Sequence, residues 1–163
     1  MISSNRTTAN DMRRIASVFA KSFSAPEMLP ISLRMGNERI TGIPERFSPT
    51  VTRRRIDANL TEMRFTGTDP ATGLRIELGA LVYNDFPVYE WTLWLENTGC
   101  ADTPIISEVK GGDFSVEGTS PVLHHGTGDH CTQEHFETLI TPLPPGEAVH
   151  PEPIGGRACA GHF

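Results

Sequence analysis

The fold is decided by one continuous stretch, residues 60–97, which reads LTEMRFTGTDPATGLRIELGALVYNDFPVYEWTLWLEN. Apolar and polar residues alternate along three of its segments, residues 60–66, 74–83 and 88–97. Alternation with a period of two predicts strands that have one buried face and one exposed face. The segments are separated by short runs rich in Gly, Pro, Asn and Asp, so we expect an antiparallel meander.

Each predicted strand carries its apolar residues on one face. The residues that share this face are Thr61, Met63, Phe65, Leu74, Ile76, Leu78, Ala80, Val82, Tyr89, Trp91, Leu93 and Leu95. The turn at 67–73 needs a positive φ, which Gly73 permits. A second turn lies at 84–87, and a third, at 98–104, leads to a fourth strand that begins at 105–109.

One apolar face requires a covering layer, and no strong helical pattern follows residue 25. The expected cover is therefore a second sheet, which makes the fold class all-β, an antiparallel β-sandwich. Residues 26–163 would form this domain, with short extended pieces at 26–50 and a loop-rich C-terminal third at 121–163. Residues 1–25 form an N-terminal extension with a short helix, because Met12, Ile15, Val18 and Phe19 lie at helical spacing.

Charge is distributed unevenly along the chain. Residues 1–55 hold ten Lys or Arg against four acids, a balance of +6, whereas residues 56–163 hold four against sixteen, a balance of −12. The basic part has no interleaved aromatic residues and no recognisable reading motif, so we predict no nucleic-acid partner. Contact between the two oppositely charged parts, or between subunits, explains the pattern with fewer assumptions.

Composition also bears on the compartment. No stretch approaches the roughly 18 apolar residues of a membrane span, and we predict no signal peptide and no membrane partner. The three cysteines are widely spaced and form no CxxC pair. A reducing, cytoplasmic location is the simplest expectation.

A histidine-rich stretch, HHGTGDHCTQEHF, begins at His124. A folded loop could gather His124, Asp129, His130 and Cys131 around a metal ion, so a metal-binding β-sandwich stays an alternative. Adjacent strand residues face opposite ways, however, and only one of His124 and His125 can point inward. We therefore predict a polar loop that contacts backbone, a partner or a sugar, with no metal and no cofactor.

No residue type marks a catalytic centre. A dyad of Cys131 with His125 or His135 has no supporting local sequence, and none of the twenty acidic residues lies in a motif that singles it out. Trp94 lies on the mixed strand face, where it would pack against another layer or stack on a sugar. Two glycines precede Arg157, so its guanidinium could approach a carboxylate or a hydroxyl-rich ligand.

Three motifs, in order, carry a resemblance to a family. DFPVYEWTLWLENTGCADTPII (85–106), LHHGTGDHC (123–131) and GGRACAGHF (155–163) look like the N-terminal part of bacterial α-galactosidase-like enzymes of glycoside hydrolase family 36. The resemblance covers roughly residues 35–163. One departure is GGRAC where the family pattern has GGRSS, which removes two hydroxyls and adds Cys159.

The resemblance implies a β-supersandwich of the galactose-mutarotase class, as a fragment of a longer hydrolase. In the family a (β/α)₈ barrel follows and supplies two catalytic aspartates; nothing in this chain matches that barrel, so no catalytic residue is carried over. The expected partners are that barrel, a galactoside and a second copy of the chain. Candidate residues for the domain interface or its sugar-facing edge are His124, His125, Asp129, His130, Arg157 and Trp94. A stand-alone carbohydrate-binding module remains the main alternative function.

Overall fold

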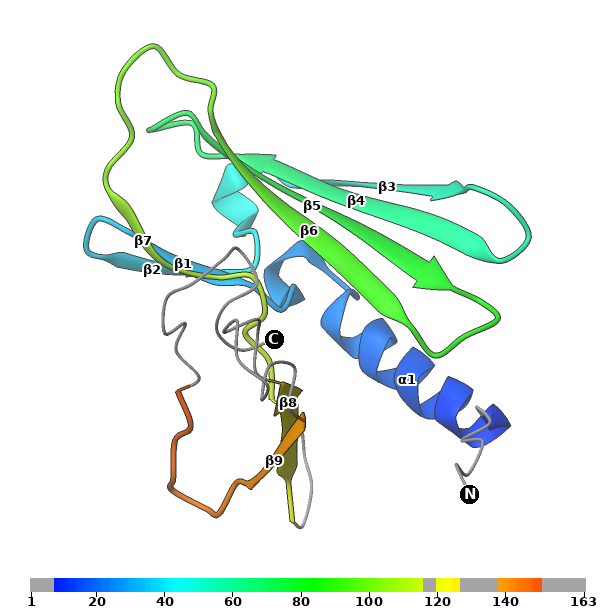
Figure 1. Cartoon of the computed structure of the whole chain (residues 1–163). Coiled ribbons are helices and arrows are strands. Elements are labelled where there is room, and N and C mark those ends of the chain that lie inside the picture. The colour runs from blue at the N-terminus through cyan, green and yellow to red at the C-terminus, as the bar shows by residue number, and fades with distance from the viewer. Residues whose placement is uncertain (1–7, 116–119, 127–137, 151–163) are drawn as a thin grey trace, which may run out of the picture. The chain divides into compact units, whose positions relative to one another are not determined.

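A computed structural model describes residues 8–115, 120–126 and 138–150 (Figure 1). The chain divides into two compact units, Met1–Phe114 and Ser115–Phe163.

The elements follow in chain order. They are α1 (Ala9–Ser22), the 3₁₀ turn η1 (Pro26–Met28), β1 (Ser32–Met35), β2 (Glu38–Thr41), the 3₁₀ turn η2 (Glu45–Phe47), β3 (Thr50–Arg55), β4 (Leu60–Thr68), β5 (Leu74–Tyr83), β6 (Tyr89–Asn97), β7 (Ile106–Lys110), β8 (Val122–Gly126) and β9 (Thr138–Pro142). The strands are antiparallel throughout, so the predicted all-β class is confirmed.

The predicted meander forms a four-stranded sheet in the order β3-β4-β5-β6. Leu78 in β5 lies opposite Phe65 in β4 and Leu93 in β6, so the three apolar faces coincide. Leu78 and Ile76 are fully buried. Gly73 adopts a φ of 75° in the turn between β4 and β5, as the sequence predicted.

The strand that follows β6 is placed differently from the prediction. Residues 105–109 were expected to continue the meander, but β7 pairs with β1 in a second sheet of order β2-β1-β7. The connection, residues 98–105, is longer than the two to five residues of a tight hairpin, and Pro104 has no N–H for a ladder. The fourth strand of the meander sheet is instead β3, which precedes it.

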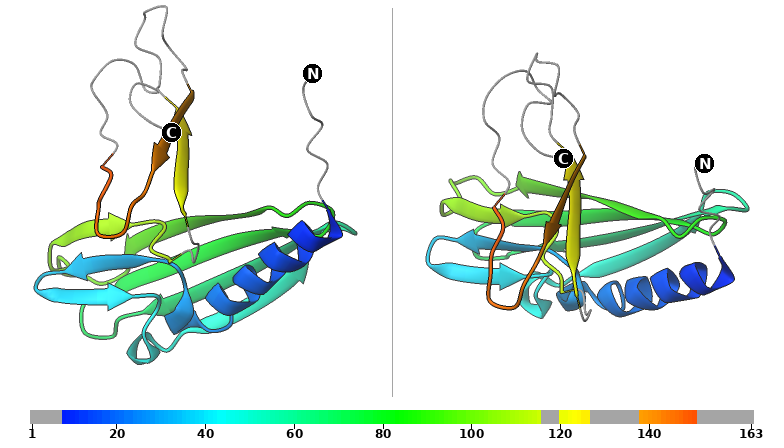
Figure 2. Two further views of the ribbon diagram at one scale, coloured as in Figure 1. Left: turned by 90° about the horizontal axis from the view of Figure 1, so that it is seen from below. Right: turned by 60° about the horizontal axis from the view of Figure 1, so that its bottom comes forward.

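Two elements cover the apolar face of the four-stranded sheet. One is the three-stranded sheet, whose Leu33 and Ile40 are buried in the same core as Leu78. The other is the predicted helix, α1, which lies on that same side of the sheet (Figures 1 and 2). The expected second sheet is therefore present, and the helix shares its role.

Aromatic residues attach α1 to the sheet. The Phe19 ring stacks on Tyr89 at 4.0 Å between centroids, and Phe23, at the end of the helix, lies 5.6 Å from Trp91. The helix begins with a capping box, in which the Asp11 carboxylate accepts from the Thr8 backbone N–H and the Thr8 hydroxyl accepts from the Asp11 N–H. Local capping and tertiary aromatic packing thus fix both ends of this element.

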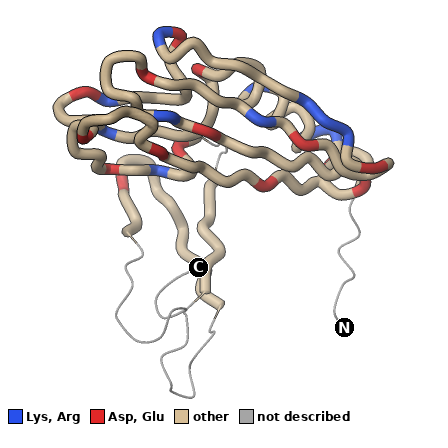
Figure 3. Tube along the Cα trace, turned by 90° about the horizontal axis from the view of Figure 1, so that it is seen from above, with Lys and Arg blue, Asp and Glu red and all other residues tan. Residues whose placement is uncertain are grey.

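The basic part of the chain contacts the acidic part, as its charge predicted. Ion pairs join Arg34 to Glu108 at 3.0 Å, Arg39 to Asp113 at 2.8 Å and Arg54 to Glu62 at 3.1 Å. Figure 3 shows basic and acidic residues interspersed along the strands. None of the helices in the described ranges is long and apolar enough to span a membrane.

In the second unit, β8 pairs with β9, and Pro144 to Gly146 lie in the loop that follows. Short strands flanked by proline-rich loops are what the sequence predicted for this region.

Candidate functional sites

Trp94 lies on the outer face of the four-stranded sheet, opposite the core. Its side chain is 47% exposed, whereas Trp91, three residues earlier on the same strand, faces the core side and donates from Nε1 to the Gly111 carbonyl at 2.6 Å. The Trp94 indole lies over Gly79, because a Cβ built on Gly79 would be 3.1 Å from its Cζ3 and 3.4 Å from its Cη2. The edge of the six-membered ring at Cζ3 and Cη2 therefore contacts the sheet at Gly79.

Ion pairs flank this indole. Arg64 pairs with Glu77 and with Glu62, the latter at 3.0 Å, and Arg75 pairs with Glu96. The side chains of Arg64, Arg75, Glu77 and Trp94 line one shallow depression of about 450 Å³. The exposed indole thus has hydrogen-bond donors and acceptors beside it.

Two residues of this cluster, Glu62 and Arg64, have shifted pKa values. Hydrogen bonding to Arg64, with the nearby charge of Arg54, lowers the pKa of the Glu62 carboxyl below its ordinary value, although desolvation opposes the shift. The pKa of the Arg64 guanidinium is raised, first by its bond to Glu62 and then by the charge of Glu77. Both shifts favour the ionised forms of Glu62 and Arg64, which stay paired at neutral pH.

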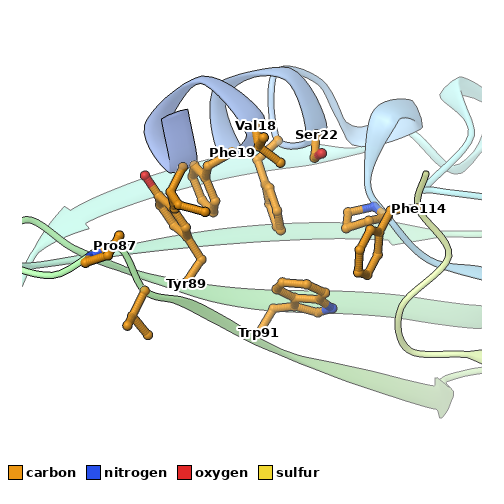
Figure 4. Close-up of a pocket in the computed structure, with 11 residues that line it drawn as sticks. Val18, Phe19, Ser22, Pro87, Tyr89, Trp91 and Phe114 are labelled. Atoms are coloured by element: carbon orange, nitrogen blue, oxygen red, sulfur yellow. The ribbon is translucent and has the colours of Figure 1, made fainter. Parts of the chain in front are cut away.

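An apolar pocket of about 330 Å³ lies between α1 and β6 (Figure 4). Val18 and Phe19 enter it from the helix, Tyr89 and Trp91 from the strand, and Phe114 closes one side. Burial raises the pKa of the Tyr89 phenol above its usual range, so the hydroxyl stays protonated at neutral pH.

The rim of this pocket is exposed and apolar. Phe114 is 58% exposed and Val88 47% exposed. β6 is the last strand in the order of its sheet, so among the described residues it has a strand neighbour on one side only. An open strand edge beside exposed apolar side chains is a surface on which another polypeptide can pack.

His124 and His125 are neighbours on β8 and do not converge. His124 is exposed, while His125 is half-buried with Nε2 3.0 Å from the Thr141 hydroxyl. The expectation that only one of the two histidines points inward is confirmed. Of the other residues proposed for this region, Asp129, His130, Cys131 and Arg157 lie outside the described residues, so their roles stay predictions.

Within the described ranges, no group of three or more His, Cys, Asp or Glu side chains could hold a metal ion. The alternative metal site combined His124 with three residues beyond these ranges and stays untested. Cys100 is an exposed free thiol.

The sequence placed Trp94 on the outer face but did not indicate the apolar pocket. Two pairs of aromatic residues in the sequence belong to this pocket. Phe19 and Phe23 are one helical turn apart, and Tyr89 and Trp91 share one face of a strand. Four aromatic residues on two facing elements make a cluster, but a pattern in one element does not reveal its partner.

A scan of protein-family models, a search of curated proteins and a search of solved structures each return no match.

Proposed function

We propose that this chain is a non-catalytic β domain of an α-galactosidase-like glycoside hydrolase. It would pack against a (β/α)₈ barrel of the parent protein and support contacts at the substrate mouth or between subunits. The resemblance of three motifs in a shared order supports the family. The observation that carries the docking role is the open apolar pocket between α1 and β6, with Phe114 and Val88 on its rim.

A protein partner suits this surface better than a polar ligand. The pocket wall is formed mainly by aromatic and aliphatic side chains, and the polar atom of Trp91 is already bonded to Gly111. Exposed apolar area of this kind favours burial against another protein surface. The outer helices of a barrel would supply apolar side chains for it.

The finer parts of the proposal rest on sequence. His124, His125, Asp129, His130 and Arg157 belong to the motifs that match the family, and we place them at the interface or its sugar-facing edge. A galactoside is the expected ligand there and a second copy of the chain the expected oligomer partner. Three cysteines without paired spacing support a cytoplasmic location.

The docking role is tested by titrating the full chain with a separately produced (β/α)₈ barrel of a family 36 α-galactosidase. We expect saturable binding that Val88→Asp and Phe114→Asp each weaken at least tenfold, because a buried unpaired carboxylate is costly. The matched control is Val51→Asp: Val51 is 48% exposed but lies on β3, the other edge strand of the sheet.

Two results would contradict the proposal. One is no binding by the native chain. The other is equal weakening by Val51→Asp and Val88→Asp, which would place the contact elsewhere. The chain alone should not hydrolyse an aryl α-galactoside, since no catalytic residue of the family matches it; turnover proportional to the amount of chain would refute the non-catalytic assignment.

A further inference from the structure

We infer that the β3 edge of the four-stranded sheet binds the phosphate group of a small molecule, held between the guanidinium groups of Arg53 and Arg55. β3 is the first strand in the order of this sheet, and β6, which lines the docking pocket, is the last. The site shares no residue with that pocket. The inference therefore goes beyond the proposed function and does not depend on it.

The register of the sheet places the two arginines on one face. Arg55 lies opposite Thr61 in β4, whereas Arg54 lies opposite Glu62 and pairs with it at 3.1 Å. Because alternate residues of a strand share a face, Arg53 and Arg55 project to the same side, about 6.6 Å apart along the strand. Arg54 projects to the other side, where its charge is compensated.

The positive charge of Arg53 and Arg55 is not compensated in this way. Both residues are exposed, and within the described ranges neither forms an ion pair. The acid that follows them, Asp57, caps the turn, since its Oδ1 accepts from the backbone N–H groups of Asn59 and Leu60. Two neighbouring guanidinium groups repel each other, and an anion between them would relieve that repulsion. A phosphate monoester carries about −1.5 to −2 charges at pH 7, which matches the two cations.

Arg55 is held in position by the turn between β3 and β4. Its Nε donates to the Asp57 carbonyl at 2.9 Å, and its Nη2 donates to the Ala58 carbonyl at 3.4 Å. A guanidinium has five N–H groups, so three remain for a ligand. Because the group is already ordered, it loses less side-chain entropy on binding than a free surface arginine would.

A depression of about 580 Å³ lies at these arginines, within the range of about 300–1,000 Å³ usual for small-molecule sites. It is lined by Arg53, Arg55, Thr61 and Asn84. Thr61 is only 7% exposed, yet its hydroxyl has no hydrogen bond within the described part of the chain. The Asn84 backbone N–H donates to the Asn59 carbonyl at 2.7 Å, which fixes the side-chain amide beside the depression. A hydroxyl and an amide can both donate to phosphate oxygens.

The lining favours a small phosphate over a nucleic acid or a carboxylate. None of the four lining residues is aromatic, whereas single-stranded nucleic acids bind on aromatic stacking platforms. Arg54, the third arginine of the run, projects away and is paired, so the positive surface does not extend as a stripe. A single carboxylate carries one charge and would leave one guanidinium uncompensated.

The test is an NMR titration of the ¹⁵N-labelled full chain with inorganic phosphate and with phenyl phosphate, at an ionic strength held constant with sodium chloride. We expect saturable shifts in β3 and in the turns at 56–59 and 84–88. Arg53→Gln and Arg55→Gln should each weaken binding at least about tenfold, because each removes a charge-assisted hydrogen bond. Thr61→Val, which keeps the side-chain shape without the hydroxyl, should weaken it severalfold.

The matched control is Arg54→Gln, which removes the same charge one residue away on the other face and should change the dissociation constant less than about twofold. Arg53→Gln guards against misfolding, since the Arg53 side chain makes no hydrogen bond or ion pair within the described residues. Phe114→Asp, which weakens docking, should bind phosphate as the native chain does, so this inference and the docking proposal can fail separately.

Four results would overturn the inference. Shifts that do not saturate, or equal weakening by Arg53→Gln and Arg54→Gln, would mean diffuse attraction of anions. Malonate that binds as tightly as phenyl phosphate would mean a carboxylate site. Affinity for single-stranded oligonucleotides that rises with their length would mean a nucleic-acid surface.

Discussion

At the scale of single residues, the two tryptophans of β6 show how position on a strand decides a role. Trp91 and Trp94 are three residues apart, so they face opposite sides of the sheet. Trp91 lies on the core side and donates a hydrogen bond to the Gly111 carbonyl. Trp94 lies on the outer face, where it is exposed and contacts Gly79. The alternation of apolar and polar residues along the strand predicted the face on which each tryptophan lies. It could not predict Gly79 as the support, because that contact depends on the register between two strands.

Asp113 is the residue whose charge most clearly links the strands of the smaller sheet. Its carboxylate accepts a hydrogen bond from the Ser32 hydroxyl and pairs with Arg39 and Lys110. The Ser32 hydrogen bond and, less strongly, the two cations lower its pKa from the ordinary value of 3.8. The folded state therefore favours the ionised carboxylate.

This shift predicts a pH-dependent loss in Asp113→Asn. Because the folded pKa lies below the unfolded one, the stabilisation is fully present above pH 3.8 and is lost as the pH falls through the folded pKa. The difference in free energy of unfolding between the native chain and the variant should therefore be constant near neutral pH and shrink in acid. Urea denaturation from pH 7 to pH 2.5 measures it. Asp102→Asn, in the exposed loop after β6, serves as control. A difference that does not change with pH would contradict the assignment.

At the scale of elements, the alternation of apolar and polar residues predicted the strands β4, β5 and β6 and the buried face of each. The glycine at position 73 predicted the turn between β4 and β5. The alternation also predicted that residues 105–109 begin a strand, but not which sheet that strand joins. Pairing between β7 and β1 is a contact between distant parts of the chain, and alternation within five residues does not encode it. The helix was predicted from spacing, whereas its packing through Phe19 on Tyr89 was not.

The two faces of β5 predict opposite sensitivities to truncation. Leu78 is fully buried between β4 and β6 on the core face, while Leu81, on the outer face, is only partly buried. Leu78→Ala should lower the free energy of unfolding by about 2–5 kcal/mol, since it removes buried methyl groups and leaves a cavity. Leu81→Ala should cost clearly less. Equal losses in chemical denaturation would mean that the register of the sheet is wrong.

At the scale of the whole molecule, the sequence predicted the class of fold and the contact between its basic and acidic parts. The candidate sites were predicted less completely. Trp94 was identified, the histidines of β8 were correctly expected to diverge, and Asp129, His130 and Arg157 stay predictions. The apolar pocket was missed because α1 and β6, which form it, are separated by more than sixty residues.

We propose that this pocket and the β6 edge dock a catalytic barrel. Amide hydrogen exchange of the chain, with and without a family 36 barrel, tests it most directly because it reports on every strand at once. We expect slower exchange in residues 15–23, in β6 and near Phe114, with exchange in β3 unchanged. Protection confined to β3, or none anywhere at saturating barrel, would contradict it.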